Sequence, residues 1–131
     1  QKWSRAVIDS VYTEVSPFVG FNGDEDQGLM GSLSVLMKIG LFQLDGGTTE
    51  NPIYHIGSPI FDEITISLSD LYYPGKTFKI VTQNNSKKNV YVQSAKLNGK
   101  PLKRMYLNHN EIISGGELVL EMGSEPNKKQ K

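Results

Sequence analysis

No cysteine occurs among the 131 residues of the chain. This absence excludes disulfides, thiol nucleophiles and zinc–thiolate sites, and it is compatible with a periplasmic or secreted protein. The chain also has no apolar run near the roughly 20 residues that a membrane-spanning helix needs. We therefore expect no membrane insertion.

The chain has no excess of charge of either sign, because 14 lysines and arginines balance 14 aspartates and glutamates. A non-specific nucleic-acid binder needs a basic stripe. The densest basic cluster lies at residues 128–131, and we interpret it as a solvated terminus. We therefore expect no nucleic-acid partner.

The length of the chain suits one domain with a modest hydrophobic core. The sequence starts at Gln1 without a signal peptide, inside a segment of helical periodicity, so we expect a mature or truncated start.

Residues 1–44 predict two helices. In the first, apolar side chains recur at spacings of three and four: Trp3, Val7, Ile8, Val11 and Tyr12. Pro17 ends this helix, and a second helix is predicted from about Gln27 to Ile39, with Gly40 as its C-terminal stop. Two helices cannot bury both of their faces. They either pack on the rest of the chain or belong to a larger helical domain, and the second arrangement exposes apolar surface in the isolated chain.

Residues 45–131 show the period-two alternation that is typical of β-strands. The alternating pairs are Ile64 and Ile66, Phe78 and Ile80, Val90 and Val92, and Leu118 and Leu120. Turn signals separate these runs, and Asn98-Gly99 predicts a two-residue hairpin. We therefore predict an α+β fold, with two N-terminal helices in residues 1–44 and an antiparallel, β-sandwich-like, all-β domain in residues 45–131.

The run Asn22-Gly23-Asp24-Glu25-Asp26-Gln27-Gly28 places three carboxylates at the start of the second predicted helix. A calcium loop of the EF-hand type is excluded, because counting from Asp24 puts Leu29 at the glycine position and Val35 at the glutamate position. Two interpretations remain open from the residues alone. One carboxylate caps the helix and the others face solvent, or a pair of carboxylates performs acid/base hydrolysis.

Other candidate site residues favour structural roles. His55 lies in an apolar strand-like stretch, and His109 lies where a short helix starts, so a transition-metal cluster is not expected. Trp3, Tyr72 and Tyr73 suit a sugar-stacking platform, but aromatics so far apart in sequence more often belong to cores or turns.

Several motifs in the same order resemble glycoside hydrolase family 92, the calcium-dependent exo-α-mannosidases. Residues 23–30 are similar to the family signature G-D-E-D-x-G-Q-M, and residues 54–61 are similar to Y-x-I-G-S-P-L-F. Further similar stretches are residues 75–78, 91–99 and 121–127. The match departs from the family where the signature continues Q-M-S-A-W, since this chain has Leu29 and Leu33 in place of the glutamine and the tryptophan.

The resemblance implies the C-terminal portion of a longer, calcium-dependent, inverting exo-α-mannosidase of the α-1,2 type, which removes terminal mannose from glycans. It implies that the two helices close an (α/α)6 barrel. It also implies that Asp26 is the general base, that Asp24 is its partner, and that the general acid and most calcium ligands lie upstream in the same polypeptide. The isolated chain is then expected to be inactive. The alternative hypothesis is a non-catalytic carbohydrate-binding or structural β-domain, and a third is a calcium-binding module.

Overall fold

The computed structural model describes residues 1–12, 16, 18 and 29–128. Its elements, in chain order, are α1 (Lys2–Ser10), α2 (Leu29–Ile39), β1 (Leu41–Phe42), β2 (Ile53–Ile56), β3 (Glu63–Ser67), β4 (Thr77–Gln83), β5 (Tyr91–Leu97), β6 (Lys100–Pro101), β7 (Tyr106–Asn108), α3 (His109–Ile113) and β8 (Gly116–Gly123). The predicted α+β class is confirmed. α1 and α2 correspond to the two predicted helices within the described residues.

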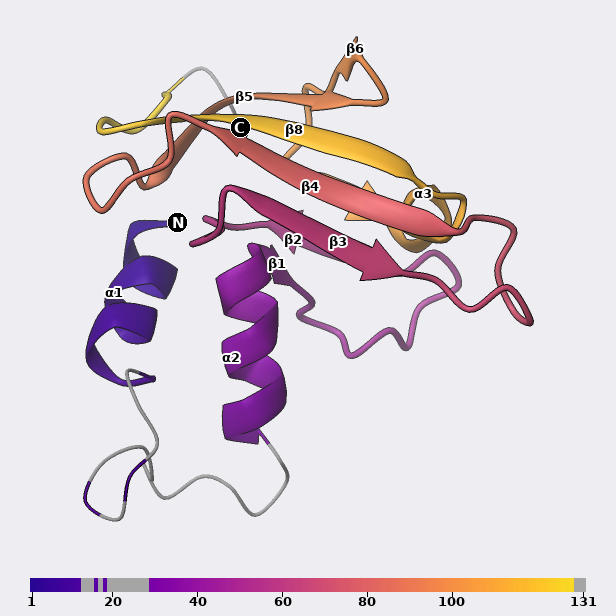
Figure 1. Ribbon diagram of the computed structural model, residues 1–131, viewed down its shortest axis with the longest axis horizontal. Coiled ribbons are helices and arrows are strands. Elements are labelled where there is room, and N and C mark those ends of the chain that lie inside the picture. The colour runs from indigo at the N-terminus through magenta and orange to yellow at the C-terminus, as the bar shows by residue number, and fades with distance from the viewer. Residues whose placement is uncertain (13–15, 17, 19–28, 129–131) are drawn as a thin grey trace.

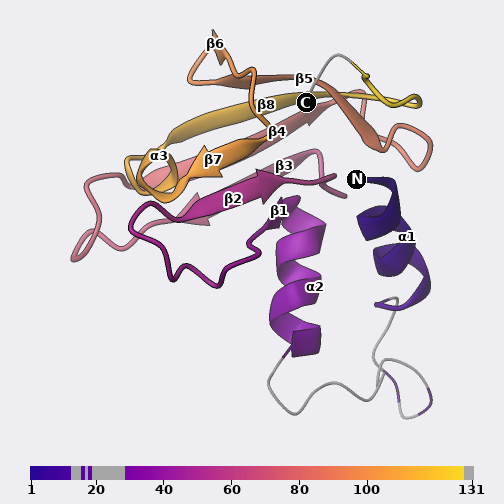
Figure 2. The same ribbon diagram turned by 180° about the vertical axis from the view of Figure 1, so that it is seen from behind.

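The strands form two sheets. One has five strands in the order β3-β4-β8-β5-β6, and the other has three strands in the order β1-β2-β7. The three-stranded sheet lies beneath the five-stranded sheet, and α1 and α2 lie side by side beyond it (Figures 1 and 2). One hydrophobic core joins residues of both sheets, including Leu41, Ile56 and Leu107 from the smaller sheet and Phe78 and Leu118 from the larger.

The predicted alternation corresponds to burial in the two central strands. Phe78 and Ile80 of β4 are fully buried, and so are Leu118 and Leu120 of β8, while their neighbours in sequence are more exposed. Ile80 lies opposite Leu118 in the register of the two strands. Side chains at every second position of these two strands therefore form the centre of the core, on one face of the larger sheet.

The pairing of β4 with β8 corrects the expectation of an antiparallel arrangement, because these two strands are parallel. The other strand pairs are antiparallel. Parallel neighbours need a long crossover, and here the crossover includes β5, β6, β7 and α3 before the chain returns as β8 between β4 and β5. Turn residues indicate only which neighbouring strands form hairpins, so they do not predict the pairing of β4 with β8.

Two predicted local features are confirmed. Asn98 and Gly99 have positive φ angles of 50° and 78° and join β5 to β6, as a type I′ hairpin requires. Gly40 ends α2 with a φ of 77°, and its N–H donates to the carbonyl of Met37. β1 follows immediately and pairs with β2, so residues on both sides of position 45 share a sheet. The division into domains at that position stays a prediction.

Candidate functional site

The acidic run with Asp24, Glu25 and Asp26 lies outside the described residues. In the sequence, the run lies between α1, which ends at Ser10, and α2, which begins at Leu29. Both of these helix ends lie on the side of the molecule remote from the sheets (Figure 1). The capping and catalytic roles of Asp24 and Asp26 therefore stay predictions.

A buried arginine anchors α1 to the β-rich part of the chain. Arg5 is only 7% exposed. Its Nε donates to Ser58 Oγ at 3.0 Å, and its Nη2 donates to Asn85 Oδ1. Burial lowers the pKa of Arg5, while the negative charge of Asp9 on the same helix opposes this effect. The helix that leads towards the acidic run is thus fixed to two separate loops.

Sequence reasoning missed this role of Arg5. The available signal was its position three residues before Ile8, which places both side chains on one face of the helix. Ile8 is buried as well, so the arginine lies on the packed face of α1. An isolated charge in such a position indicates a specific polar partner.

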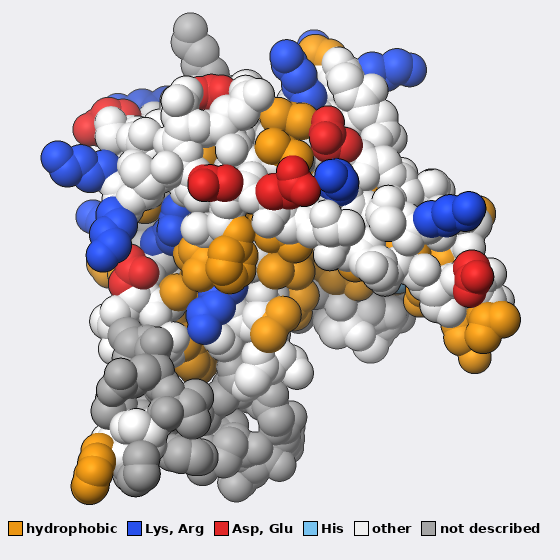
Figure 3. All heavy atoms as spheres, viewed as in Figure 1, with side chains coloured by type: hydrophobic (Ala, Val, Ile, Leu, Met, Phe, Trp, Pro, Cys, Tyr) orange, Lys and Arg blue, Asp and Glu red, His pale blue; other side chains and the backbone are white. Residues whose placement is uncertain are grey.

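The helices expose apolar surface. Trp3 is 76% exposed and Val35 is 58% exposed. An apolar cleft of about 300 Å³ lies where α1, α2 and β1 meet, and its lining residues are Trp3, Ser4, Val7, Met37, Gly40, Leu41, Phe42 and Gly57. Hydrophobic side chains are also visible between the helices in Figure 3. This is the exposure expected of helices that belong to a larger helical domain.

The aromatic candidates do not form one platform. Tyr73 contacts His109 edge-on at a ring-centroid distance of 6.2 Å, and His109 stacks on Tyr54 at 6.0 Å. Tyr72 contacts Tyr73 in the connection between β3 and β4. Trp3 lies on α1 at the other end of the molecule (Figure 1). The three predicted stacking residues are therefore split, and the tyrosines form a separate group with His109.

His109 begins α3, as its sequence context predicts, and the helix start has a complete capping box. Glu111 accepts a hydrogen bond from the backbone N–H of Asn108 at 2.8 Å and forms an ion pair with Arg104. Burial raises the pKa of Glu111, but the hydrogen bonds from Arg104 and Asn108 and the charge of Arg104 outweigh it and hold the pKa below its usual value. This cluster stabilises the helix start.

No group of three His, Asp or Glu side chains suited to a metal ion occurs in the part of the chain that the structure describes. Calcium needs six to eight oxygen ligands, with carboxylates prominent among them. The described residues therefore do not fit a calcium site. No helix among these residues is long and apolar enough to cross a bilayer.

Comparison with known proteins identifies the family. The model of the glycosyl hydrolase family 92 catalytic domain matches residues 1–124. The chain belongs to glycosyl hydrolase family 92. The acidic run and the buried Ser58 both lie inside the matched span.

One curated protein is similar to this chain in sequence, and solved structures of family 92 mannosidases are similar to it in both sequence and fold. An uncharacterized secreted glycosidase from Arthroderma benhamiae is 36% identical over 128 residues, which is 95% of this chain and 15% of the relative. The inverting mannosidase BT2199 from Bacteroides thetaiotaomicron is 35% identical, with a TM-score of 0.83 over 98% of this chain and 16% of that structure. The α-mannosidase BT3965 from the same organism, in complex with mannoimidazole, is 30% identical with a TM-score of 0.84, over 98% of this chain and 16% of that structure.

The chain thus spans only 15–16% of the length of these relatives. Its α+β fold matches one portion of the structures of the two mannosidases.

Proposed function

We propose that this chain is the C-terminal portion of the catalytic domain of an inverting, calcium-dependent exo-α-mannosidase of the α-1,2 type. The substrates are terminal mannose residues of glycans. The observation that carries this proposal is the family match over residues 1–124, which includes the acidic run. The mannosidase names of BT2199 and BT3965 support the substrate class.

Inversion at the anomeric carbon requires two carboxyl groups on opposite sides of the scissile bond, about 6.5–9.5 Å apart, with a water between one of them and the sugar. We assign the water-activating base to Asp26 and its partner to Asp24. We assign no catalytic role to Glu25, which lies between them in the sequence. The general acid lies in the much larger part of the enzyme that this chain does not span.

The same reasoning applies to calcium and to the remainder of the fold. Since the described residues do not fit a calcium site, most ligands lie in other parts of the polypeptide. Exposed apolar side chains of α1 and α2, among them Trp3 and Val35, pack against upstream helices, with which the two helices complete an (α/α)6 barrel. The secreted fungal relative supports a secreted or periplasmic location.

The decisive variant is Asp26→Asn in the complete polypeptide. The amide keeps the shape of the side chain but cannot accept the proton of the attacking water. We expect kcat on an aryl α-mannoside to fall at least about 100-fold, the lower range for acid/base catalysis. The rate is measured with and without a chelator, which tests the calcium requirement in the same assay.

Glu25→Gln is the matched control, because it removes one charge from the same run at a position without a catalytic role. We expect a rate near that of the unmodified enzyme. A near-normal rate in Asp26→Asn would make Asp26 a helix cap instead. Chelator-sensitive activity of the isolated chain would contradict a split site, and mannobiose binding by the isolated chain would favour the carbohydrate-binding alternative.

A further inference from the structure

No negatively charged side chain forms a hydrogen bond or an ion pair with Arg5 in the described part of the chain. Its two hydrogen-bond acceptors, Ser58 and Asn85, are neutral side chains. Asp9 lies one turn further along α1, and no ion pair joins it to Arg5 among the described residues. Buried charges in proteins are normally paired, because desolvation of an unpaired ion is costly. We therefore expect a negatively charged group to bind next to this guanidinium.

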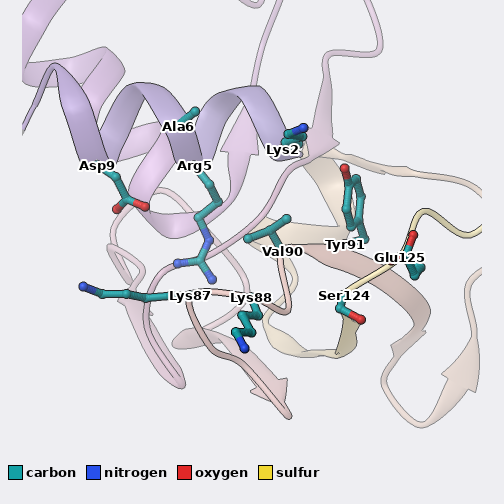
Figure 4. A pocket seen from close by; sticks show the side chains of 10 residues that line it. All are labelled: Lys2, Arg5, Ala6, Asp9, Lys87, Lys88, Val90, Tyr91, Ser124 and Glu125. Atoms are coloured by element: carbon teal, nitrogen blue, oxygen red, sulfur yellow. The ribbon is translucent and has the colours of Figure 1, made fainter.

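Arg5 lines a cleft of about 460 Å³, a volume within the range of ligand pockets. Figure 4 shows the guanidinium group directed away from α1, towards the connection between β4 and β5 that carries Lys87 and Lys88. Four basic side chains line this cleft, and they are Lys2, Arg5, Lys87 and Lys88. The two acidic lining residues are Asp9 and Glu125. The cleft therefore carries an excess of positive charge.

We propose that this cleft binds a doubly charged tetrahedral oxyanion of the phosphate class, with Arg5 as its anchor. The planar guanidinium matches the oxygens of such an anion, and its Nη1 has no hydrogen-bond partner within the described part of the chain. Nε and Nη2 are already held by Ser58 and Asn85, so the group is oriented before the anion arrives. Lys87 and Lys88 supply further positive charge from the opposite wall.

The cleft is formed by three segments that are distant in sequence. They are α1, the connection between β4 and β5, and the residues that follow β8. An anion bound there joins α1 to the larger sheet, in addition to the direct contacts of Arg5. The cleft does not include the acidic run, so a negative result for phosphate binding would not affect the proposed mannosidase activity, and the reverse also holds.

The test is a titration of the complete polypeptide with inorganic phosphate at constant ionic strength, followed by ³¹P NMR line broadening and calorimetry. We expect saturable binding and competition by sulfate. Lys87→Glu combined with Lys88→Glu should weaken phosphate binding at least about 10-fold, since two attractive charges become repulsive. The double variant Lys100→Glu and Lys103→Glu, on exposed residues of and after β6, makes the same change in net charge and should alter affinity less than about 2-fold.

Arg5→Lys keeps the positive charge but loses the planar fork, so we expect phosphate binding to be lost while circular dichroism stays unchanged. If this variant unfolds, the lysine pair at 87 and 88 still decides the question. Absence of saturable binding would overturn the proposal. Equal weakening by the control pair would also overturn it, because binding would then reflect net charge alone. If the unmodified polypeptide binds no phosphate and the Lys87→Glu and Lys88→Glu variant melts at a lower temperature, a carboxylate of the polypeptide itself occupies the cleft. This result would also overturn the proposal.

Discussion

Glu111 shows how one carboxylate stabilises a helix start and makes stability depend on pH. Its pKa is lowered in the folded protein, mainly because hydrogen bonds from Arg104 and Asn108 outweigh burial. A carboxylate with a lowered folded pKa contributes stability above its unfolded pKa of about 4.3, and this contribution is lost as the pH falls through the folded value. We expect Glu111→Gln to reduce the free energy of unfolding by about 1–2 kcal/mol at pH 7.

The pH dependence is measured by denaturant unfolding between neutral pH and pH 3, where the variant should show a flatter slope below about pH 4.3. Glu63→Gln is the control, because Glu63 forms an exposed ion pair with Lys79 at 3.1 Å. Such surface pairs contribute roughly 0–1 kcal/mol. Equal losses in the two variants would show that the capping box adds nothing beyond a surface charge pair.

At this scale the sequence predicts residues whose role is set by their neighbours in the chain. The helix start at His109 and the turn at Asn98-Gly99 follow from local hydrogen bonding and backbone preference. Arg5 could not be assigned in the same way, because its acceptors lie 53 and 80 residues further along the chain. The roles of Asp24 and Asp26 follow from the family resemblance and stay predictions.

Among the elements, α2 depends on the glycine that ends it. Gly40 has a φ of 77°, and its carbonyl accepts the N–H of Gly57 at 2.7 Å. A Cβ at this position would overlap the ring of Pro59 and lie 2.7 Å from its nitrogen. We therefore expect Gly40→Ala to cost at least about 3 kcal/mol of stability, since the clash adds to a left-handed backbone cost of roughly 1–2 kcal/mol.

Gly46→Ala separates these two contributions. Gly46 also has a positive φ, of 62°, but a Cβ there would meet no atom within 4 Å. Its loss should be limited to about 1–2 kcal/mol, measured by denaturant unfolding of both variants. If both substitutions cost the same, the packing of Pro59 against the end of α2 contributes nothing.

The elements themselves were largely predictable, whereas their partners were not. Period-two alternation identifies the buried faces of β4 and β8, because side chains on one face recur at every second residue. The alternation of apolar and polar residues does not predict which strand pairs with which. The parallel pairing of β4 with β8 joins strands that are separated by four other elements, so neither turn residues nor spacing predicts it.

For the whole molecule, the exposed apolar face on the helices predicts a difference between the isolated chain and the complete polypeptide. Trp3 is largely exposed, and it lines the apolar cleft between the helices. Trp3→Ser should change the stability of the isolated chain by less than about 0.5 kcal/mol, as expected for an exposed position. In the complete polypeptide, where the proposed barrel packing covers this face with upstream helices, the same change should cost about 2 kcal/mol or more.

Thermal or denaturant unfolding of both forms provides the comparison. The control is Leu71→Ser, which replaces another largely exposed apolar residue in the connection between β3 and β4, away from the helices (Figure 1). Small effects of Trp3→Ser in both forms would show that the apolar face stays open, and the proposed packing of α1 and α2 into a barrel would then be wrong.

The position of β8 in the larger sheet has a consequence for how the protein is made. β8 lies between β4 and β5, although it is synthesised after both of them. Until residue 123 has left the ribosome, β4 and β5 lack the neighbour that provides Leu118 and Leu120 to the core. The hairpins β3–β4 and β5–β6 can form early, but the sheet can close only when synthesis of this segment is complete. A chain truncated before β8 would therefore have two open strand edges, on β4 and β5, and would be a substrate for chaperones and proteases.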